Sequence, residues 1–337
     1  MSARRFSSSE ADLIRRIRGV AGLSAQVSSQ IRLAIGDDAA ALRTTRGLLT
    51  LFSIDALVEG IHFDLKYFTP EDLGWKALAV NLSDIAAMGG KPLCFVTSIA
   101  IPKAANLQFV SKLYRGMMEL AGRIKIPLVG GDTCASPHGI FLDLAIVGEV
   151  KPTELVRRSE ARPGDLLFVS GQLGGSAMGL ELLRTRRSGA RRLQSLVRRH
   201  LRPVPRCKLG RLLARQHLAS AMIDLSDGLS TDLGRLCESS RVGAVIDTAS
   251  IPVASKPAGG LPFLNKNPLH YAVHGGEDYE LLFTVPSRIR GKVPSAVEGI
   301  PIHEIGVITG EAGKCWIRDQ GHLKRLFPGG FEHFSVY

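Results

Sequence analysis

The stretch TPEDLGWKALAVNLSDIAAMGG, residues 69–90, predicts a helix whose two ends are both marked in the sequence. Thr69 is suited to cap the first turn, Pro70 fits the first helical position, and acidic residues follow in the same turn. The pair Gly89-Gly90 ends the helix, because glycine readily adopts the backbone conformation that closes a helix. The elements on either side can be placed outward from this helix.

Helical spacing sorts the residues of this helix onto two sides. The apolar side carries Leu78, Leu82 and Ile85. The other side carries Asn81, Asp84 and Met88. The spacing therefore predicts that the Asp84 carboxylate projects from a defined surface of the helix.

Strands are predicted on both sides of this helix. An apolar run at residues 48–55 precedes the helix and ends on Asp55. The elements that follow are a strand at 94–101, a helix with an apolar stripe at 107–120, and strands at 127–132 and 140–150. With 36 glycines and only 6% aromatic residues, the composition fits an α/β or α+β fold with many tight turns.

A second half of similar size follows. Residues 164–171 form a predicted strand that runs into a glycine turn at 172–176 and then a helix. Such a turn can bind an anion with its backbone amides, or it can merely reverse the chain. The segment 221–236 places three polar residues at a helix start, namely Asp224, Ser226 and Asp227. We predict two domains, residues 1–150 and 151–337.

The formal net charge of +12 is carried mainly by arginines, many of them between residues 184 and 215. This segment lacks interleaved aromatic residues, and its leucines at 193, 196 and 201 predict an amphipathic helix with a solvated face. We therefore expect no nucleic-acid partner. A generally positive field would still help to collect anionic substrates.

The five cysteines are widely spaced and form no C-x-x-C pair, so we expect reduced thiols and no disulfide frame or zinc site. No stretch has the length and apolarity of a signal peptide or a membrane span. We expect a cytoplasmic protein without a membrane partner.

Short acidic motifs recur along the chain, after apolar runs or beside glycine. Their members are Asp37, Asp38, Asp55, Asp84, Asp132, Asp224 and Asp227. Any single Asp can end a strand or cap a helix. The repeated setting instead predicts a shared site for a hard cation such as Mg²⁺, which takes oxygen ligands and commonly binds phosphate as well. Clustered carboxylates would otherwise raise one another's pKa.

The sequence contains no Walker A pattern and none of the H-R-D or D-F-G motifs of protein kinases. A kinase with this sequence would therefore belong to another architecture, one that uses several metal ions.

Six motifs, in their order along the chain, resemble the thiamine-monophosphate kinase family. They are Gly36-Asp37-Asp38, SIDALVEGIHF (53–63), NLSDIAAMGG (81–90), VGGDT (129–133), IDLSDGL (223–229) and HGGEDYELLF (274–283). Each motif alone is weak, whereas the ordered set is specific and covers most of the chain.

The resemblance implies a two-domain aminoimidazole ribonucleotide synthetase-like fold. Its N-terminal α/β domain has a mixed sheet that builds a barrel with a second subunit, so a homodimer is expected, and its C-terminal domain is α+β. The implied reaction is the ATP-dependent phosphorylation of thiamine monophosphate to thiamine diphosphate, the last step of thiamine diphosphate biosynthesis. It implies direct in-line transfer with several Mg²⁺ ions and with ATP as the phosphoryl donor.

The resemblance also assigns site residues. The implied magnesium ligands are Asp37, Asp55, Asp84, Asp132, Asp224 and Asp227, with Ser53 and the position of Ile54 in the first metal cluster. Asp55, Asp84 and Asp132 would hold metals on the triphosphate and so serve catalysis. The implied ATP contacts are Gly131, Asp132, Arg158 and Ser226. The implied substrate contacts are His62, Glu277 and Phe331, the last in a tail that offers two phenylalanines.

One position departs from the family pattern, which usually has Thr where this chain has Ile54. If that Thr binds a metal through its hydroxyl, the ligand is lost here. If it binds through its carbonyl, nothing changes. A water molecule could also take the place, since Mg²⁺ commonly keeps several waters.

The related enzymes of the superfamily fit less well. Selenophosphate synthetases need a reactive Cys or selenocysteine near the N-terminus, whereas the first Cys here is Cys94. The hydrogenase-maturation member ends in a cysteine tail, and this chain ends in Ser335-Val336-Tyr337. The ribonucleotide synthetase has a D-G-V-G-T-K type segment where this chain has residues 55–60. A non-enzymatic alternative is an Arg-rich nucleotide- or RNA-binding protein on the same fold, which would not consume ATP.

Overall fold

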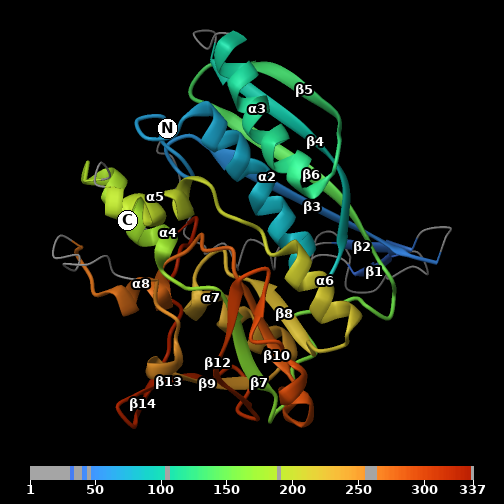
Figure 1. The fold of residues 1–337 in the computed structure, drawn as a ribbon, viewed down its shortest axis with the longest axis vertical. Helices are drawn as coiled ribbons and strands as arrows, with labels where there is room; N and C mark the ends of the chain where they lie inside the picture. The colour runs from blue at the N-terminus through green and yellow to red at the C-terminus, as the bar shows by residue number, and fades with distance from the viewer. Residues whose placement is uncertain are drawn as a thin grey trace, which may run out of the picture.

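The computed structural model of the chain describes residues 31–33, 40–43, 47–102, 107–187, 191–254 and 264–334. The predicted ligand Asp37 and its neighbour Asp38 lie outside these ranges. Within them the chain forms two sheets, in the upper and lower halves of Figure 1, with helices on and between them. None of the described helices combines the length and the apolarity needed to cross a membrane.

The first sheet has the strand order β1-β2-β3-β6-β4-β5. Its strands are β1 (Ile31–Leu33), β2 (Ala40–Arg43), β3 (Leu49–Val58), β4 (Lys91–Pro102), β5 (Leu128–Ser136) and β6 (Phe141–Val150). β3 pairs antiparallel with β6 along its whole length, and β4 pairs parallel with β5, so the sheet is mixed. The four strands predicted for this half are confirmed as β3, β4, β5 and β6.

Two helices, α2 (Pro70–Ala87) and α3 (Leu107–Ile124), cover one face of the first sheet (Figure 1). The predicted start of α2 is confirmed, since the Thr69 side chain accepts a hydrogen bond from Asp72 N. The two helices approach closely at glycine, because a Cβ on Gly74 would lie 1.9 Å from the Leu113 carbonyl oxygen.

The burial of α2 corrects one expectation. The Asn81 and Met88 side chains have no exposed surface, and the residues between Leu73 and Ala87 are buried on nearly all sides. The reason is that α3 and α6 (Cys207–Arg215) pack against α2 in addition to the first sheet and β8. Asp84 is half-buried and lies within the junction of the two sheets rather than on an open helix face.

The second sheet has the strand order β14-β13-β9-β12-β7-β10-β8, with β11 paired to β12. Its strands are β7 (Leu166–Ser170), β8 (Ala221–Asp224), β9 (Gly243–Asp247), β10 (Leu281–Val285), β11 (Ala296–Val297), β12 (Ile300–Thr309), β13 (Cys315–Asp319) and β14 (His322–Arg325). β8 and β7 pair antiparallel with β10, which places the end of β8 beside the loop that precedes β10.

Five further helices and three short 3₁₀ turns complete the described part of the second half. They are α4 (Gly175–Arg184), α5 (Gln194–Leu201), α6, α7 (Leu229–Ser240), α8 (Pro268–His274), η1 (Arg191–Leu193), η2 (Thr248–Ser250) and η3 (Ser287–Lys292). The predicted amphipathic helix in the Arg-rich segment is confirmed as α5, with Leu193 and Leu196 buried.

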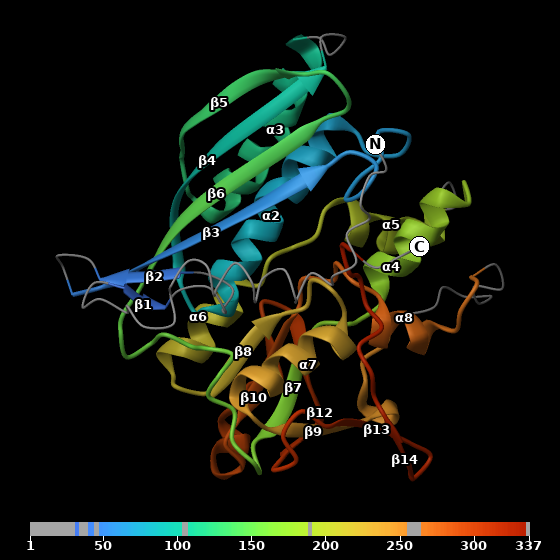
Figure 2. The same cartoon turned by 180° about the vertical axis from the view of Figure 1, so that it is seen from behind.

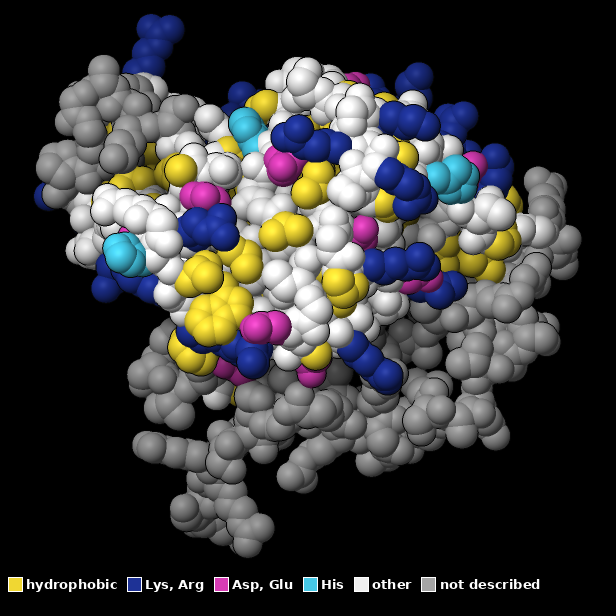
Figure 3. Space-filling view, turned by 90° about the horizontal axis from the view of Figure 1, so that it is seen from below, with side chains coloured by type: hydrophobic (Ala, Val, Ile, Leu, Met, Phe, Trp, Pro, Cys, Tyr) yellow, Lys and Arg dark blue, Asp and Glu magenta, His cyan; other side chains and the backbone are white. Residues whose placement is uncertain are grey.

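Several arginines of this segment bind other parts of the chain. Arg199 donates to the Gln172 carbonyl at 2.9 Å, and Arg206 donates to Glu280 at 2.6 Å. Figure 3 views the molecule from the end that holds the second sheet. On this face, Lys and Arg side chains are spread among acidic and apolar ones. Part of the arginine excess therefore serves packing between helices and strands.

One apolar core joins the two sheets. Leu78 and Met88 of α2 belong to the same buried cluster as Met222 of β8 and Phe283 of β10. Because α2 packs against the first sheet on one side and against β8 on the other, it lies at the junction between the halves.

Candidate active site at the junction of the two sheets

Strand β3 presents two of the predicted metal ligands toward α2. Side chains alternate across a strand, and Ser53 is buried on the same face as Leu51. The Ser53 hydroxyl donates a hydrogen bond to the Asp84 carboxylate on α2. Asp55 follows on this same face and is half-exposed. β3 and α2 thus place a hydroxyl and two carboxylates on one side of the first sheet.

Ile54 faces the other way. Its side chain is 63% exposed and lies on the opposite face of β3 from Ser53 and Asp55. A side-chain hydroxyl at this position would therefore point away from the Ser53–Asp84 pair. Only the backbone of Ile54 can contribute there, so the loss of the family's Thr hydroxyl does not change this side of the site.

The buried Tyr279 is influenced by carboxylates from both halves of the chain. Burial raises the pKa of Tyr279 well above its ordinary value, and the negative charges of Glu277, Asp55, Asp224 and Asp227 raise it further. Asp55 comes from the first sheet, whereas Asp224 and Asp227 come from the end of β8 and the turn after it. Carboxylates from the two halves therefore all raise the pKa of the same side chain, Tyr279.

The turn between β8 and α7 is held by a carboxylate that the sequence did not single out. The Asp232 side chain accepts hydrogen bonds from Asp227 N and Gly228 N, both at 3.0 Å. Arg235 binds the carboxylates of Asp227 and Asp232. Burial, together with the nearby Asp227, raises the pKa of Asp232 to about 7. Asp232 lies in the first turn of α7, where acidic side chains often bind backbone N–H groups, and this position could have identified it in the sequence.

The C-terminal segment returns to this turn. Phe331 N donates to the Asp227 carbonyl at 3.1 Å, which places the Phe331 ring 6.4 Å from that of His62. A Cβ on Gly330 would lie 1.9 Å from the same Asp227 oxygen, so only glycine allows this approach. His62 and Phe331, two predicted substrate contacts, are thus brought together although 269 positions separate them.

The protonation state of His62 follows from its contacts. Val58 N donates to His62 Nδ1 at 3.0 Å, so the proton of a neutral ring is on Nε2. Burial and the neighbouring His333 lower the pKa of His62 to about 4, and the ring is neutral near pH 7. Its Nε2 lies 3.5 Å from His333 Nε2. His62 therefore offers a hydrogen-bond donor at the junction.

Glu277, the third predicted substrate contact, is engaged by the protein itself. Its carboxylate lies 2.6 Å from Lys76 Nζ and 3.1 Å from His200 Nδ1. About a quarter of the Glu277 side chain remains exposed. Sequence reasoning missed Lys76 and His200, although a lysine within the apolar run of α2 was a signal for a buried charge.

The glycine turn after β7 does not offer its amides to an external anion. The Asp278 carboxylate accepts hydrogen bonds from Gly174 N at 2.5 Å and from Ser176 N at 3.1 Å. The amides of the turn do bind an anionic group, but this group is the Asp278 side chain of the chain's own 274–280 loop.

Asp132 lies apart from these residues. Asp132 on β5 is exposed and opposite Ser98, which is opposite Asp143 on β6. Asp143 is opposite Ala56, so this row lies on the face away from Asp55. Three strand spacings separate β5 from β3, about 14 Å.

Arg158 is placed near the far end of α7, where its carbonyl accepts a hydrogen bond from Ser240. The helix starts just after Asp227, and its 12 residues span about 18 Å. Gly131 has a structural reason to be glycine, since a Cβ there would lie 2.1 Å from the Thr97 carbonyl oxygen. The roles of Arg158 and Gly131 in binding ATP stay predictions.

The chemistry of the converging donors fits a hard cation. They are carboxylate and hydroxyl oxygens, and the negative field at Tyr279 is one that bound cations would neutralise. In the described part of the chain, no three His, Cys, Asp or Glu side chains lie close enough together to form a ready metal centre. The donors would hold Mg²⁺ together with other oxygens, such as those of a phosphate and water.

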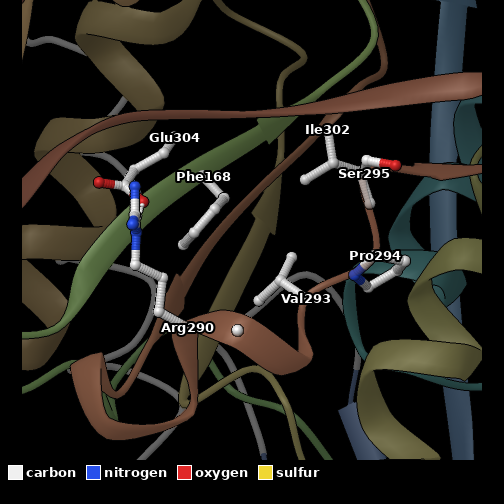
Figure 4. Close-up of a pocket in the computed structure, with 8 residues that line it drawn as sticks. Phe168, Arg290, Val293, Pro294, Ser295, Ile302 and Glu304 are labelled. Atoms are coloured by element: carbon white, nitrogen blue, oxygen red, sulfur yellow. Dashed lines mark hydrogen bonds and ion pairs between the residues drawn. The ribbon is translucent and has the colours of Figure 1, made fainter.

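A hollow of about 310 Å³ lies elsewhere on the second half. Phe168, Arg290, Val293, Ile302 and Glu304 are among the residues that line it, and the Arg290 side chain extends toward Glu304 (Figure 4). None of the predicted site residues contributes to its lining. The contacts that do join predicted residues, between Ser53 and Asp84 and between His62 and Phe331, lie at the junction and not in this hollow.

Known proteins resemble this chain over most of its length. The family model described as "AIR synthase related protein, N-terminal domain" matches residues 36–150, and "AIR synthase related protein, C-terminal domain" matches residues 162–315. "Thiamine-monophosphate kinase" of Bacillus subtilis (strain 168) is 36% identical and covers 91% of this chain and 95% of its own length. "Thiamine-monophosphate kinase" of Escherichia coli (strain K12) is 39% identical over 91% of this chain and 93% of its own.

A solved structure described as "AaThiL complexed with AMPPCP and TMP" has a TM-score of 0.84 and 33% identity, and it covers 99% of both chains. The predicted two-domain aminoimidazole ribonucleotide synthetase-like fold class is therefore confirmed. The barrel shared across a dimer stays a prediction.

Proposed function

Because the chain belongs to the thiamine-monophosphate kinase family, within the AIR synthase related proteins, we propose that it phosphorylates thiamine monophosphate to thiamine diphosphate with ATP. The observations that support the proposal within this chain are the Ser53–Asp84 hydrogen bond and the charges of Asp55, Asp224 and Asp227, from both halves, which all raise the pKa of Tyr279. This would be the last step of thiamine diphosphate biosynthesis.

The transfer would be direct and in line, with no phosphorylated protein intermediate. The acceptor is a phosphate oxygen that is already anionic near neutral pH, so no general base has to remove a tightly held proton. The difficulty is the repulsion between two polyphosphates. When bound, several Mg²⁺ ions would neutralise the phosphate oxygens and draw donor and acceptor together.

Residues from both halves of the chain would bind the metal ions. Asp55, Asp84 and Ser53 would hold metal from the first sheet and α2, and Asp224 and Asp227 would do so from the second. The attachment of these residues to β3, α2, β8 and the turn after β8 fixes the donor oxygens before the substrate binds.

The acceptor would bind at the other side of the junction, against His62, Glu277 and Phe331. The neutral His62 donates from Nε2, and Glu277 presents an ionised carboxylate that suits a cationic thiazolium ring. The Phe331 ring offers a stacking surface beside His62.

We also propose a homodimer formed through the first sheet, whose second face no described element covers (Figure 2). Large apolar side chains are exposed on these strands, namely Phe52, Ile54, Val96, Val129 and Phe141. A row of such residues on an open sheet is typical of a protein interface. Asp132 lies on this face, so its role in binding metal and ATP would belong to the assembled dimer.

The other predicted ATP contacts, Gly131, Arg158 and Ser226, and the metal ligand Asp37 stay predictions, as does the division into residues 1–150 and 151–337. The expected cytoplasmic location and the expected absence of a nucleic-acid partner stay predictions as well.

The activity is tested by incubating the purified protein with Mg-ATP and thiamine monophosphate and measuring thiamine diphosphate as its oxidised fluorescent derivative. Product that depends on Mg²⁺, ATP and protein together supports the proposal. ATP binding without product, or salt-sensitive RNA binding without ATP consumption, contradicts it and favours a fold that has been reused for binding.

A further inference from the structure

Helix α2 carries a lysine in the interior of the protein. The Lys76 side chain has no exposed surface. Its ammonium lies 2.6 Å from Glu277 Oε1, donates to the His62 carbonyl oxygen at 3.3 Å, and lies 5.2 Å from the centre of the Phe68 ring. A buried ammonium is tolerated only when it is paired and hydrogen-bonded. Here the partners come from one loop of each half of the chain.

The other carboxylate oxygen of Glu277 contacts a histidine. Glu277 Oε2 lies 3.1 Å from His200 Nδ1, which is also 3.1 Å from the Ser176 hydroxyl. Glu277 itself has a left-handed backbone, with φ of 65°. A non-glycine residue keeps this conformation only where its surroundings fix it. Lys76 and His200 are the contacts that fix its side chain.

The charges around Glu277 are well defined. The titratable and charged groups that face it or His200 are Lys76, His62, Tyr67, Arg184 and Tyr279. Although burial opposes ionisation, Lys76 and His200 hold the pKa of Glu277 well below its ordinary value. Burial and the Lys76 charge lower the pKa of His200. The group is therefore an ammonium, a carboxylate and a neutral imidazole.

We propose that Lys76 is a positioning residue for the acceptor site, because it fixes the Glu277 carboxylate from the second half against the His62 loop of the first. The inference rests on the proposed function, in which Glu277 and His62 bind thiamine monophosphate. Lys76 does not touch the substrate, since its side chain is wholly buried. Lys76 would therefore affect the binding of the acceptor more than the binding of ATP, because the acidic residues proposed to hold metal and ATP are not among its contacts.

The first test is Lys76→Met, which removes the charge and keeps the length of the side chain. We expect the KM for thiamine monophosphate to rise tenfold or more, with the dissociation constant of a nonhydrolysable ATP analogue unchanged within twofold. The matched control is Lys208→Met, which removes a lysine that pairs with Glu298 on the surface. The control should leave both values unchanged.

The second test follows the charge itself. In Lys76→Met, His200 faces the Glu277 carboxylate without the opposing ammonium, so the pKa of His200 should rise. NMR of ¹³C-labelled histidine rings, with His200 assigned by its loss in His200→Gln, measures this. In the paired variant Lys76→Met/Glu277→Gln the carboxylate charge is gone too, so the fold should be stable and His200 neutral again, while the acceptor KM stays high.

Four results would overturn the inference: an acceptor KM within twofold of the unchanged protein, an equal loss of acceptor and ATP affinity, an unchanged His200 titration, or failure of the paired variant to fold. The two proposals can fail separately. If the unchanged protein does not phosphorylate thiamine monophosphate, the proposed function fails, whereas the His200 titration still decides whether Lys76 sets the charge of this group.

Discussion

At the scale of single residues, the Ser53–Asp84 hydrogen bond joins the strand side of the site to its helix side. A carboxylate in this setting contributes charge and position together. When it becomes an amide, the charge is lost and the shape of the side chain is kept.

We predict that Asp84→Asn lowers kcat by roughly 100-fold or more, because one charged oxygen ligand is lost from the metal cluster. The shape of the side chain is kept, so the thermal unfolding temperature should change little. Asp319→Asn on the surface strand β13 is the control and should keep full activity. A near-normal rate for Asp84→Asn at ordinary Mg²⁺ would remove Asp84 from the site.

A second residue predicts a pH dependence of stability. Burial raises the pKa of Asp278 to about 7, whereas an unfolded Asp titrates near pH ~4. The folded chain therefore holds this proton more tightly. The stability that the neutral carboxyl contributes is complete below the unfolded pKa and is lost as pH rises through about 7.

The measurement is urea unfolding of the unchanged protein and of Asp278→Asn between pH 5 and 8. The free energy of unfolding of the unchanged protein should fall with pH by up to about 1.4 kcal/mol per pH unit from this group. The slope should be shallower in the variant. Equal slopes would show that Asp278 is ionised throughout.

At the scale of elements, α2 and the C-terminal segment decide which residues meet. α2 supplies Asp84 to the metal side and Lys76 to the acceptor side, one above the other along a single buried helix. The C-terminal segment reaches the junction only because Gly329 and Gly330 pass close to α7 and His274.

We predict that Gly330→Ala displaces the segment, since the added Cβ would lie 1.9 Å from the Asp227 carbonyl oxygen. The KM for thiamine monophosphate should rise about tenfold as Phe331 moves, with ATP affinity unchanged. Gly291→Ala, where the added Cβ meets nothing within 4 Å, is the matched control. Unchanged acceptor kinetics in Gly330→Ala would exclude Phe331 from the acceptor site.

Local sequence patterns predicted β3 and α2 well, because residues close in sequence mark where these elements begin and end. The cap at Thr69, the apolar run before Asp55 and the glycine pair after α2 each depend on neighbours in sequence, and β3 and α2 follow them closely. What α2 packs against is not local. The burial of Asn81 and Lys76 depends on α6 and on the 274–280 loop, which no periodicity within α2 reveals.

The candidate site divides in the same way. That acidic residues end strands was visible in the sequence, and the structure joins Asp84 to Ser53 and brings the charges of Asp55, Asp224 and Asp227 to bear on Tyr279. Their grouping in one metal site stays a prediction. The face on which Asp132 lies follows from the register of three strand pairings, which one strand cannot specify. The same holds for Asp278, whose partners lie about 100 residues earlier.

At the scale of the whole molecule, one face of the first sheet has no described element covering it (Figure 2). We predict that Ile54→Lys, which places a charge on this face, converts a dimer into monomers in sedimentation velocity. Leu323→Lys, at another exposed apolar position, on β14, is the control and should leave the assembly unchanged. A protein that is monomeric without any change would contradict the dimer.

The account depends most on one claim, that carboxylates from both halves share a single metal–phosphate site. The direct measurement is the Mg²⁺ dependence of thiamine diphosphate formation in Asp55→Asn, Asp224→Asn and the double variant. We predict that each single change raises the Mg²⁺ needed for half-maximal rate and that the double variant loses less than the product of the two effects. Independent, multiplicative effects, or no shift in either single variant, would contradict a shared site.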